Sequence, residues 1–197
     1  PTSLASGSEP CTRSTIRGGE GKCLSMVRCI NLHNPLLTKG ERIVTVSESS
    51  GCAAGLRVAV VTPYFKESPA TLQRCLTSVR AQTYPQVVHY MVADGFPQNA
   101  LLTQWPGVRH IQLPNGHANF GCTPRGVGAQ CALADGFDVV CFLDADNLIE
   151  PEHVATVVET VAKAQAAGVA LDAVFSLRYL FLPGHEHLRL VAPREDV

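Results

Sequence analysis

The stretch that decides the fold runs Val139-Val140-Cys141-Phe142-Leu143-Asp144-Ala145-Asp146-Asn147. An apolar run of this length, rich in β-branched residues, is typical of a strand buried in a parallel sheet. In open α/β sheets, ligands bind just beyond the carboxyl ends of the strands. Asp144 and Asp146 therefore occupy a position from which two carboxylates can hold a hard divalent cation, and through it a diphosphate.

On both sides of this stretch, from Arg57 onward, strand-like and helix-like segments alternate, which indicates an α/β fold with a mostly parallel sheet flanked by helices. Helices are expected to begin at Ser68-Pro69, Thr123-Pro124 and Pro151, because proline is favoured in the first helical turn and Ser or Thr is favoured just before it. Strands are predicted over residues 58–62, 87–93, 108–113, 138–143 and 173–181.

Residues 1–55 differ from the rest of the chain, because they are rich in Ser, Thr, Gly, Arg and Cys and lack sustained periodicity. We predict an irregular, poorly ordered N-terminal extension here, with a short strand at 42–46 as an open alternative. Residues 56–197 are predicted to form a single domain. The polar segment 183–197 is assigned no element.

Composition narrows the class of protein. Hydrophobic residues make up 46% of the 197 residues, and 16 Lys and Arg against 17 Asp and Glu give a net charge of -1. No basic stripe marks a nucleic-acid partner, so none is expected. No apolar run approaches the roughly 20 residues of a transmembrane helix, and no signal-peptide pattern opens the chain.

The eight cysteines include no C-x-x-C pair and no zinc-binding spacing with histidine. Cys75, Cys131 and Cys141 fall in apolar patterns and are expected to be small core residues. This cysteine usage is typical of a reduced, cytoplasmic compartment.

Polar residues follow three of the predicted strands, as Thr62 to Glu67, as Asp94-Gly95 and as Asp144-Ala145-Asp146. Parallel strands bring such ends to one edge of a sheet, so these groups are expected to meet in one crevice. The helix that begins at Thr123-Pro124-Arg125 directs its N-terminus to the same side, where its N–H groups and the Arg125 cation suit a diphosphate. The Gly- and Asn-containing segment 115–121 permits a flexible loop there.

In these residues the chain resembles the inverting glycosyltransferases of family 2, which have the GT-A fold (a Rossmann-like α/β sheet) and use nucleotide-diphospho-sugar donors. The resemblance covers about residues 57–181. It depends on the order and spacing of four motifs, which begin at Thr62, Asp94, Thr123 and Asp144. It implies transfer of a sugar to an acceptor hydroxyl, with a UDP-sugar as the favoured donor and an unknown acceptor.

The resemblance also implies roles for individual residues. Thr62, Tyr64 and Asp94 would hold the nucleotide base, and Arg125 would lie near the base or the phosphates. Asp144 would face the ribose or sugar and stand beside the metal, while Asp146 would ligate Mn²⁺ or Mg²⁺. Glu67 joins the predicted donor-binding residues, with a helix-start charge as its alternative role.

The chain departs from the family pattern after Asp146. Only 51 residues follow it, fewer than the acceptor-binding half has in the family, so we expect a donor-binding half cut from a longer enzyme. No general base is assigned, although Glu195 and Asp196 are adjacent acids near the end. The alternative is a module that binds a nucleotide or nucleotide sugar without catalysis. His185 or His187 remains an outside candidate for the metal.

Other enzyme classes with similar motifs fit less well. A haloacid-type phosphatase carries its Asp-x-Asp after the first strand, whereas here it follows the fourth. A sugar nucleotidyltransferase or a dinucleotide dehydrogenase needs a glycine-rich loop after the first strand, and residues 62–67 contain no glycine.

Overall fold

The computed structural model describes residues 28–31, 55–176, 179–180 and 190–191. The strands are β1 (Arg28–Asn31), β2 (Val58–Tyr64), β3 (Val87–Asp94), β4 (Arg109–Leu113), β5 (Val139–Phe142), β6 (Ala173–Phe175), β7 (Tyr179–Leu180) and β8 (Leu190–Val191). The helices are α1 (Pro69–Arg80), α2 (Asn99–Leu102), α3 (Cys122–Ala134) and α4 (His153–Ala166). No helix in this described part of the chain has both the length and the apolar character that crossing a membrane requires.

The main sheet has six strands in the order β4-β3-β2-β5-β1-β6. Strands β4, β3, β2 and β5 run parallel, with Val58 of β2 opposite Val87 of β3 and Val139 of β5. β1 is antiparallel to both of its neighbours, β5 and β6. The mostly parallel α/β sheet that we predicted is therefore confirmed, and β7 and β8 form a separate two-stranded sheet.

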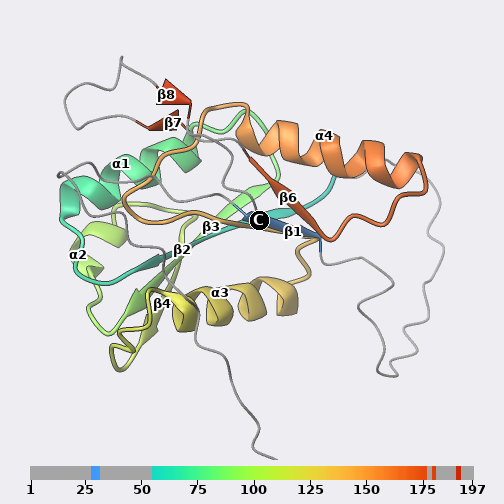
Figure 1. The fold of residues 1–197 in the computed structure, drawn as a ribbon. Helices are drawn as coiled ribbons and strands as arrows, with labels where there is room; N and C mark the ends of the chain where they lie inside the picture. Colours follow the sequence, from blue (N-terminus) through green and yellow to red (C-terminus); the bar gives the residue numbers. More distant parts are fainter. Residues whose placement is uncertain (1–27, 32–54, 177–178, 181–189, 192–197) are drawn as a thin grey trace, which may run out of the picture.

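Helices cover both faces of this sheet, as Figure 1 shows, with α1 and α4 on one side and α3 on the other. All seven residues of β2 are buried, because the central strand has a layer of side chains on each face. Val58 and Val60 belong to a cluster with residues of α1 and α4, and Ala59 and Val61 belong to one with Ala132 of α3. This alternation is the period of two that a strand imposes.

Helix α1 begins as its sequence predicts. Pro69 stands in its first turn, and the Ser68 hydroxyl accepts a hydrogen bond of 3.1 Å from the Thr71 backbone N–H. The core cysteines are also placed as expected, since Cys75 and Cys141 are buried and Cys131 packs half-buried against a core cluster.

Two predictions about the ends of the domain need correction. The irregular extension predicted for residues 1–55 is wrong at Arg28–Asn31, because these residues pair as β1 between β5 and β6. The single strand predicted over 173–181 is divided between β6 and β7, which belong to different sheets. The strand considered at 42–46 lies outside the described residues, and the domain boundary after residue 55 stays a prediction.

Helix α3 lies very close to the sheet at Gly128. A Cβ added there would be 2.5 Å from Val61 Cγ1 and 2.9 Å from Val92 Cγ2, and both valines are fully buried. Gly126, in the same helix, has no heavy atom of the described residues within 4 Å of its hypothetical Cβ. Substitution of each glycine by alanine therefore distinguishes the effect of packing, at Gly128, from the effect of intrinsic helix propensity, at Gly126.

We expect Gly128→Ala to lower the free energy of unfolding by about 1–3 kcal/mol, because overpacking a core outweighs the gain in helix propensity. Gly126→Ala should raise it by about 0.5–1 kcal/mol, since only the propensity changes there. Urea unfolding of the two variants measures both values. Equal effects of the same sign would contradict the close packing of α3.

Candidate functional site

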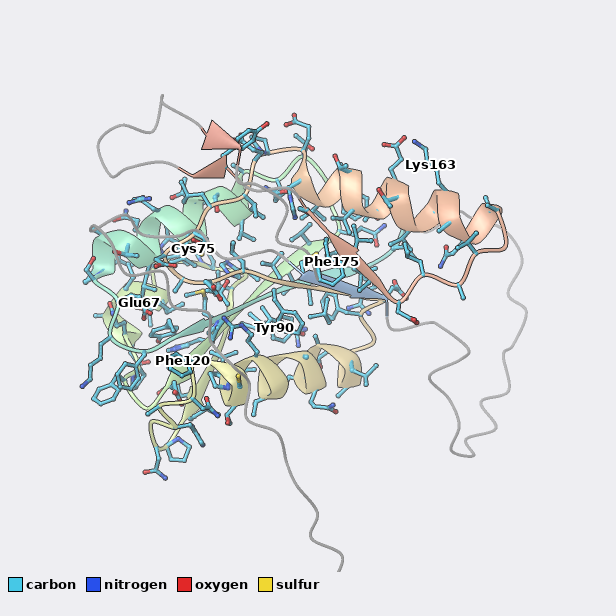
Figure 2. The ribbon with its side chains drawn as sticks, viewed as in Figure 1. Glu67, Cys75, Tyr90, Phe120, Lys163 and Phe175 are labelled. Atoms are coloured by element: carbon cyan, nitrogen blue, oxygen red, sulfur yellow. The ribbon has the colours of Figure 1, made fainter. Side chains whose placement is uncertain are left out.

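A pocket of about 610 Å³ opens at the edge of the sheet where β2, β3 and β5 end. All the predicted site residues except Thr62 line this edge pocket. Its complete lining is Pro63, Tyr64, Phe65, Glu67, Asp94, Ala118, Phe120, Gly121, Pro124, Arg125, Asp144, Ala145 and Asp146. In Figure 2, Glu67 and Phe120 lie toward one end of the sheet, and Lys163 and Phe175 lie toward the other.

Asp144 and Asp146 enter the pocket together because the chain keeps a period of two after β5. Ala145 is 3% exposed and packs into a core cluster, whereas the two aspartates on either side are half-buried. The backbone is anchored on both sides, by Leu143 N–H to the Val61 carbonyl at 3.1 Å and by Asn147 N–H to the Asp144 carbonyl at 3.0 Å. Both carboxylates therefore face the same space.

Arg125, in the first turn of α3, connects two parts of the pocket. Its Nη2 donates to Asp144 Oδ1 in a short ion pair. Its Nη1 donates to the Phe120 carbonyl at 2.7 Å. The guanidinium thus fixes the position of Asp144 relative to the segment that leads into α3, and it remains partly accessible to a ligand.

Asp94, at the end of β3, holds the segment 115–121 against the sheet. Its carboxylate is buried, with a side-chain exposure of 6%. The Asp94 oxygens accept the His117 backbone N–H at 3.1 and 3.2 Å, and Oδ1 lies 2.6 Å from His117 Nδ1. The loop that the sequence permitted to be flexible is therefore tied down by a buried acceptor. His117 was not among our predicted site residues, and the signal in its favour was the Gly- and Asn-containing segment 115–121 around it.

Tyr64 and Glu67 line the pocket and also form hydrogen bonds with neighbouring residues. The Tyr64 hydroxyl accepts the Gln98 backbone N–H at 3.0 Å and shares a hydrogen bond of 2.7 Å with His110 Nε2. Burial raises the pKa of Tyr64 and lowers that of His110, so it favours the neutral form of both groups. Glu67 Oε2 accepts the Phe65 backbone N–H at 2.6 Å, which shapes the turn after β2.

The side chain of Thr62 does not line the edge pocket. Its side chain is completely buried, and its hydroxyl bonds His89 Nε2 at 2.8 Å on the side of the sheet that Cys75 of α1 covers. Thr62 faces the α1 layer from within β2, whereas Tyr64, on the same face, is the last residue of the strand and reaches the pocket. We therefore leave the Thr62 side chain out of the candidate site.

The charges of the pocket are unbalanced. Its lining contains four carboxylates, those of Glu67, Asp94, Asp144 and Asp146, and the single guanidinium of Arg125. The effect extends to Cys75 beneath them, because burial raises the pKa of that thiol to about 12 and the charges of Asp146, Asp144 and Glu67 contribute to the increase. Such an excess of negative charge favours a cation.

The donor set fits a hard divalent ion. Within the described ranges, no group of three or more His, Cys, Asp or Glu residues forms a metal cage. Mg²⁺ ordinarily binds through one or two carboxylates together with water and substrate phosphates, and carboxylate ligands also suit Mn²⁺. Asp144 and Asp146 supply such a pair, open to a pocket large enough for a small-molecule ligand.

Comparison with known proteins identifies relatives of this chain. Residues 59–189 match the family described as Glycosyl transferase family 2. The chain is 29% identical over 118 residues to the succinoglycan biosynthesis protein ExoW of Rhizobium meliloti, covering 56% of this chain and 35% of that protein. It is 30% identical over 120 residues to an N-acetylglucosaminyltransferase of Mesorhizobium japonicum, covering 58% and 27%. The chain thus spans about a third or less of the length of these relatives.

Among solved structures, S. aureus TarS aligns with 56% of this chain and 20% of its own, at 18% sequence identity and a TM-score of 0.50. A similarity at this level concerns the fold alone. It confirms the α/β fold of the GT-A type that the motifs implied.

On the α1 side of the sheet, His89 makes the stability of the fold depend on pH. Complete burial lowers its pKa from 6.5 to about 3, so the unfolded chain binds a proton that the folded chain excludes between these values. The stability due to neutral His89 is fully present above pH 6.5 and is lost as the pH falls toward 3.

We expect the unfolding free energy of the wild-type protein to fall more steeply below pH 6.5 than that of His89→Gln, by up to about 1.4 kcal/mol per pH unit. Glutamine can still bond Thr62 but does not titrate. Urea unfolding of both proteins between pH 7 and pH 4 measures the two slopes. Identical slopes would mean that His89 is not held neutral by burial.

Proposed function

The chain belongs to glycosyl transferase family 2, and on that premise we propose that it transfers a sugar from a nucleotide-diphospho-sugar to an acceptor hydroxyl with inversion. The observation that carries the proposal is the edge pocket, where four carboxylates and one guanidinium meet at the carboxyl ends of parallel strands. This is the position at which α/β sheets bind nucleotides. A UDP-sugar is the donor to test first.

Asp146, with Asp144 beside it, would hold Mn²⁺ or Mg²⁺. When bound, the ion supplies positive charge against the diphosphate that leaves as the glycosidic bond breaks. Arg125 contributes a permanent cation to the same diphosphate. Its ion pair with Asp144 orients the guanidinium before the ligand arrives, so little ordering is needed on binding.

The base of the nucleotide would lie toward the end of β3. Asp94 is buried there and bonded to His117, and Tyr64 has its hydroxyl committed to His110 and Gln98. We propose that these residues shape the base subsite, Asp94 chiefly by fixing the loop that carries His117. Glu67 acts in the same way on the turn after β2.

A second candidate function has a specific observation in its favour. The chain spans 35% and 27% of the two curated relatives, and we assign no general base for an acceptor hydroxyl among the residues that line the edge pocket. A module that binds a nucleotide sugar without transferring it is therefore the alternative. Release of UDP from a UDP-sugar, measured with and without candidate acceptors, distinguishes the two, since the module would release none.

The metal assignment predicts the behaviour of Asp146→Asn. We expect UDP to bind the wild-type protein much more tightly with Mn²⁺ than without it. We expect the variant to lose this Mn²⁺-dependent gain in UDP affinity, because Asp146 would contact the ion directly. The loss should exceed the roughly 10- to 100-fold decrease that follows removal of a residue hydrogen-bonded to a metal ligand. Calorimetric titration of UDP, with and without Mn²⁺, measures the gain.

Glu159→Gln provides the matched control, because it also removes one carboxylate but lies on the exposed side of α4, paired with Lys163 at 2.6 Å. It should bind UDP like the wild-type protein. Unchanged Mn²⁺-dependent binding in Asp146→Asn would show that the metal assignment is wrong. No binding of either UDP or GDP to the folded wild-type protein would contradict the proposed function itself.

A further inference from the structure

We propose that the side chain of Phe120 is the platform on which the base of the donor nucleotide stacks. This inference rests on the proposed function, and it adds to it a residue that determines donor affinity. Phe120 lines the edge pocket and is 78% exposed. A planar base needs a flat apolar face to lie on, and aromatic side chains provide such faces in nucleotide sites.

The other aromatic residues of the pocket are less suited to this role. Tyr64 is 2% exposed, so its ring presents almost no surface to a ligand. Phe65 is half-buried, so only part of its ring is accessible. Among the described lining residues, Phe120 therefore offers the largest aromatic surface to a ligand.

The backbone holds Phe120 in a conformation that is unfavourable for its residue type. Its φ is 57°, and Ala118 has a φ of 50°, both in the left-handed region that side chains with a Cβ rarely adopt. Such conformations persist only where the surrounding structure imposes them, and they concentrate at ligand sites. Here the strain is an observation in its own right, independent of the exposure of the ring.

The surroundings that impose this conformation are the two halves of the site. On the N-terminal side, Asp94 accepts hydrogen bonds from the His117 backbone and ring. On the C-terminal side, the Phe120 carbonyl accepts from Arg125, which is also paired with Asp144. Phe120 thus stands between the buried acceptor at the end of β3 and the carboxylates beside the diphosphate, where a nucleoside joins the two.

The experiment compares a ligand that has a base with one that lacks it. We expect Phe120→Ala to weaken the binding of UDP in the presence of Mn²⁺ by roughly 10-fold or more. Binding of Mn²⁺-pyrophosphate should change by less than about twofold, because it has no base to stack. Phe120→Tyr keeps the ring and should bind UDP like the wild-type protein. Calorimetric titration of all three proteins with both ligands gives the result.

A further variant separates stacking from folding. Phe120→Gly relieves the left-handed strain, so it should unfold at the same or a higher urea concentration than the wild-type protein and still show the loss for UDP. Suppose that the wild-type protein shows Mn²⁺-dependent binding of UDP, and that Phe120→Ala and Phe120→Gly bind UDP equally well. This result would overturn the stacking role of Phe120 and leave the proposed function standing. Equal losses for UDP and pyrophosphate would also overturn the stacking role. A wild-type protein that binds neither ligand would overturn the proposed function as well.

Discussion

The parallel pairing of β2 with β3 on one side and β5 on the other is the constraint on which the rest of the structure depends. Every residue of β2 is buried, so its backbone groups must find their partners within the sheet. The register places Val58 opposite both Val87 and Val139, and all three strands therefore end at one edge. The edge pocket follows from this pairing, because the polar residues that follow the three strands all lie at this edge of the sheet. Gly128 allows α3 to approach the same strands closely, which brings its first turn and Arg125 to the pocket.

Electrostatics then determine what such a pocket can hold. Asp144 is paired with Arg125, and Asp94 is bonded to His117, but the lining still contains more carboxylates than cations. A divalent cation would reduce this excess of negative charge, and a cation held by one or two carboxylates can also bind a diphosphate. The same ion pairs and hydrogen bonds hold the segment 115–121 in position, so the contacts around the proposed metal ligands also fix the strained backbone at Phe120.

Much of this arrangement could be predicted from the sequence, because the decisive signals are local. The apolar run before Asp144 indicates a buried strand, and the alternation of segments indicates a parallel sheet, so Asp94, Arg125, Asp144 and Asp146 were expected at one edge. The contributions that were not predicted depend on tertiary partners. β1 has four residues in a segment without periodicity, and it is a strand because β5 and β6 pair with it. Thr62 turns to the α1 layer and bonds His89, which the motif could not indicate. The exposure and positive φ of Phe120 are likewise not indicated by its residue type, because phenylalanine rarely adopts this backbone conformation.

The measurement that tests the central claim most directly is a crystal structure of the chain grown with UDP and Mn²⁺, with data collected at the manganese absorption edge. The account predicts an anomalous peak within coordination distance of the Asp146 carboxylate, with the diphosphate bridging it to Arg125 inside the edge pocket. Manganese bound elsewhere would contradict the account. So would UDP bound elsewhere, for example in the cavity lined by His89 and Trp105.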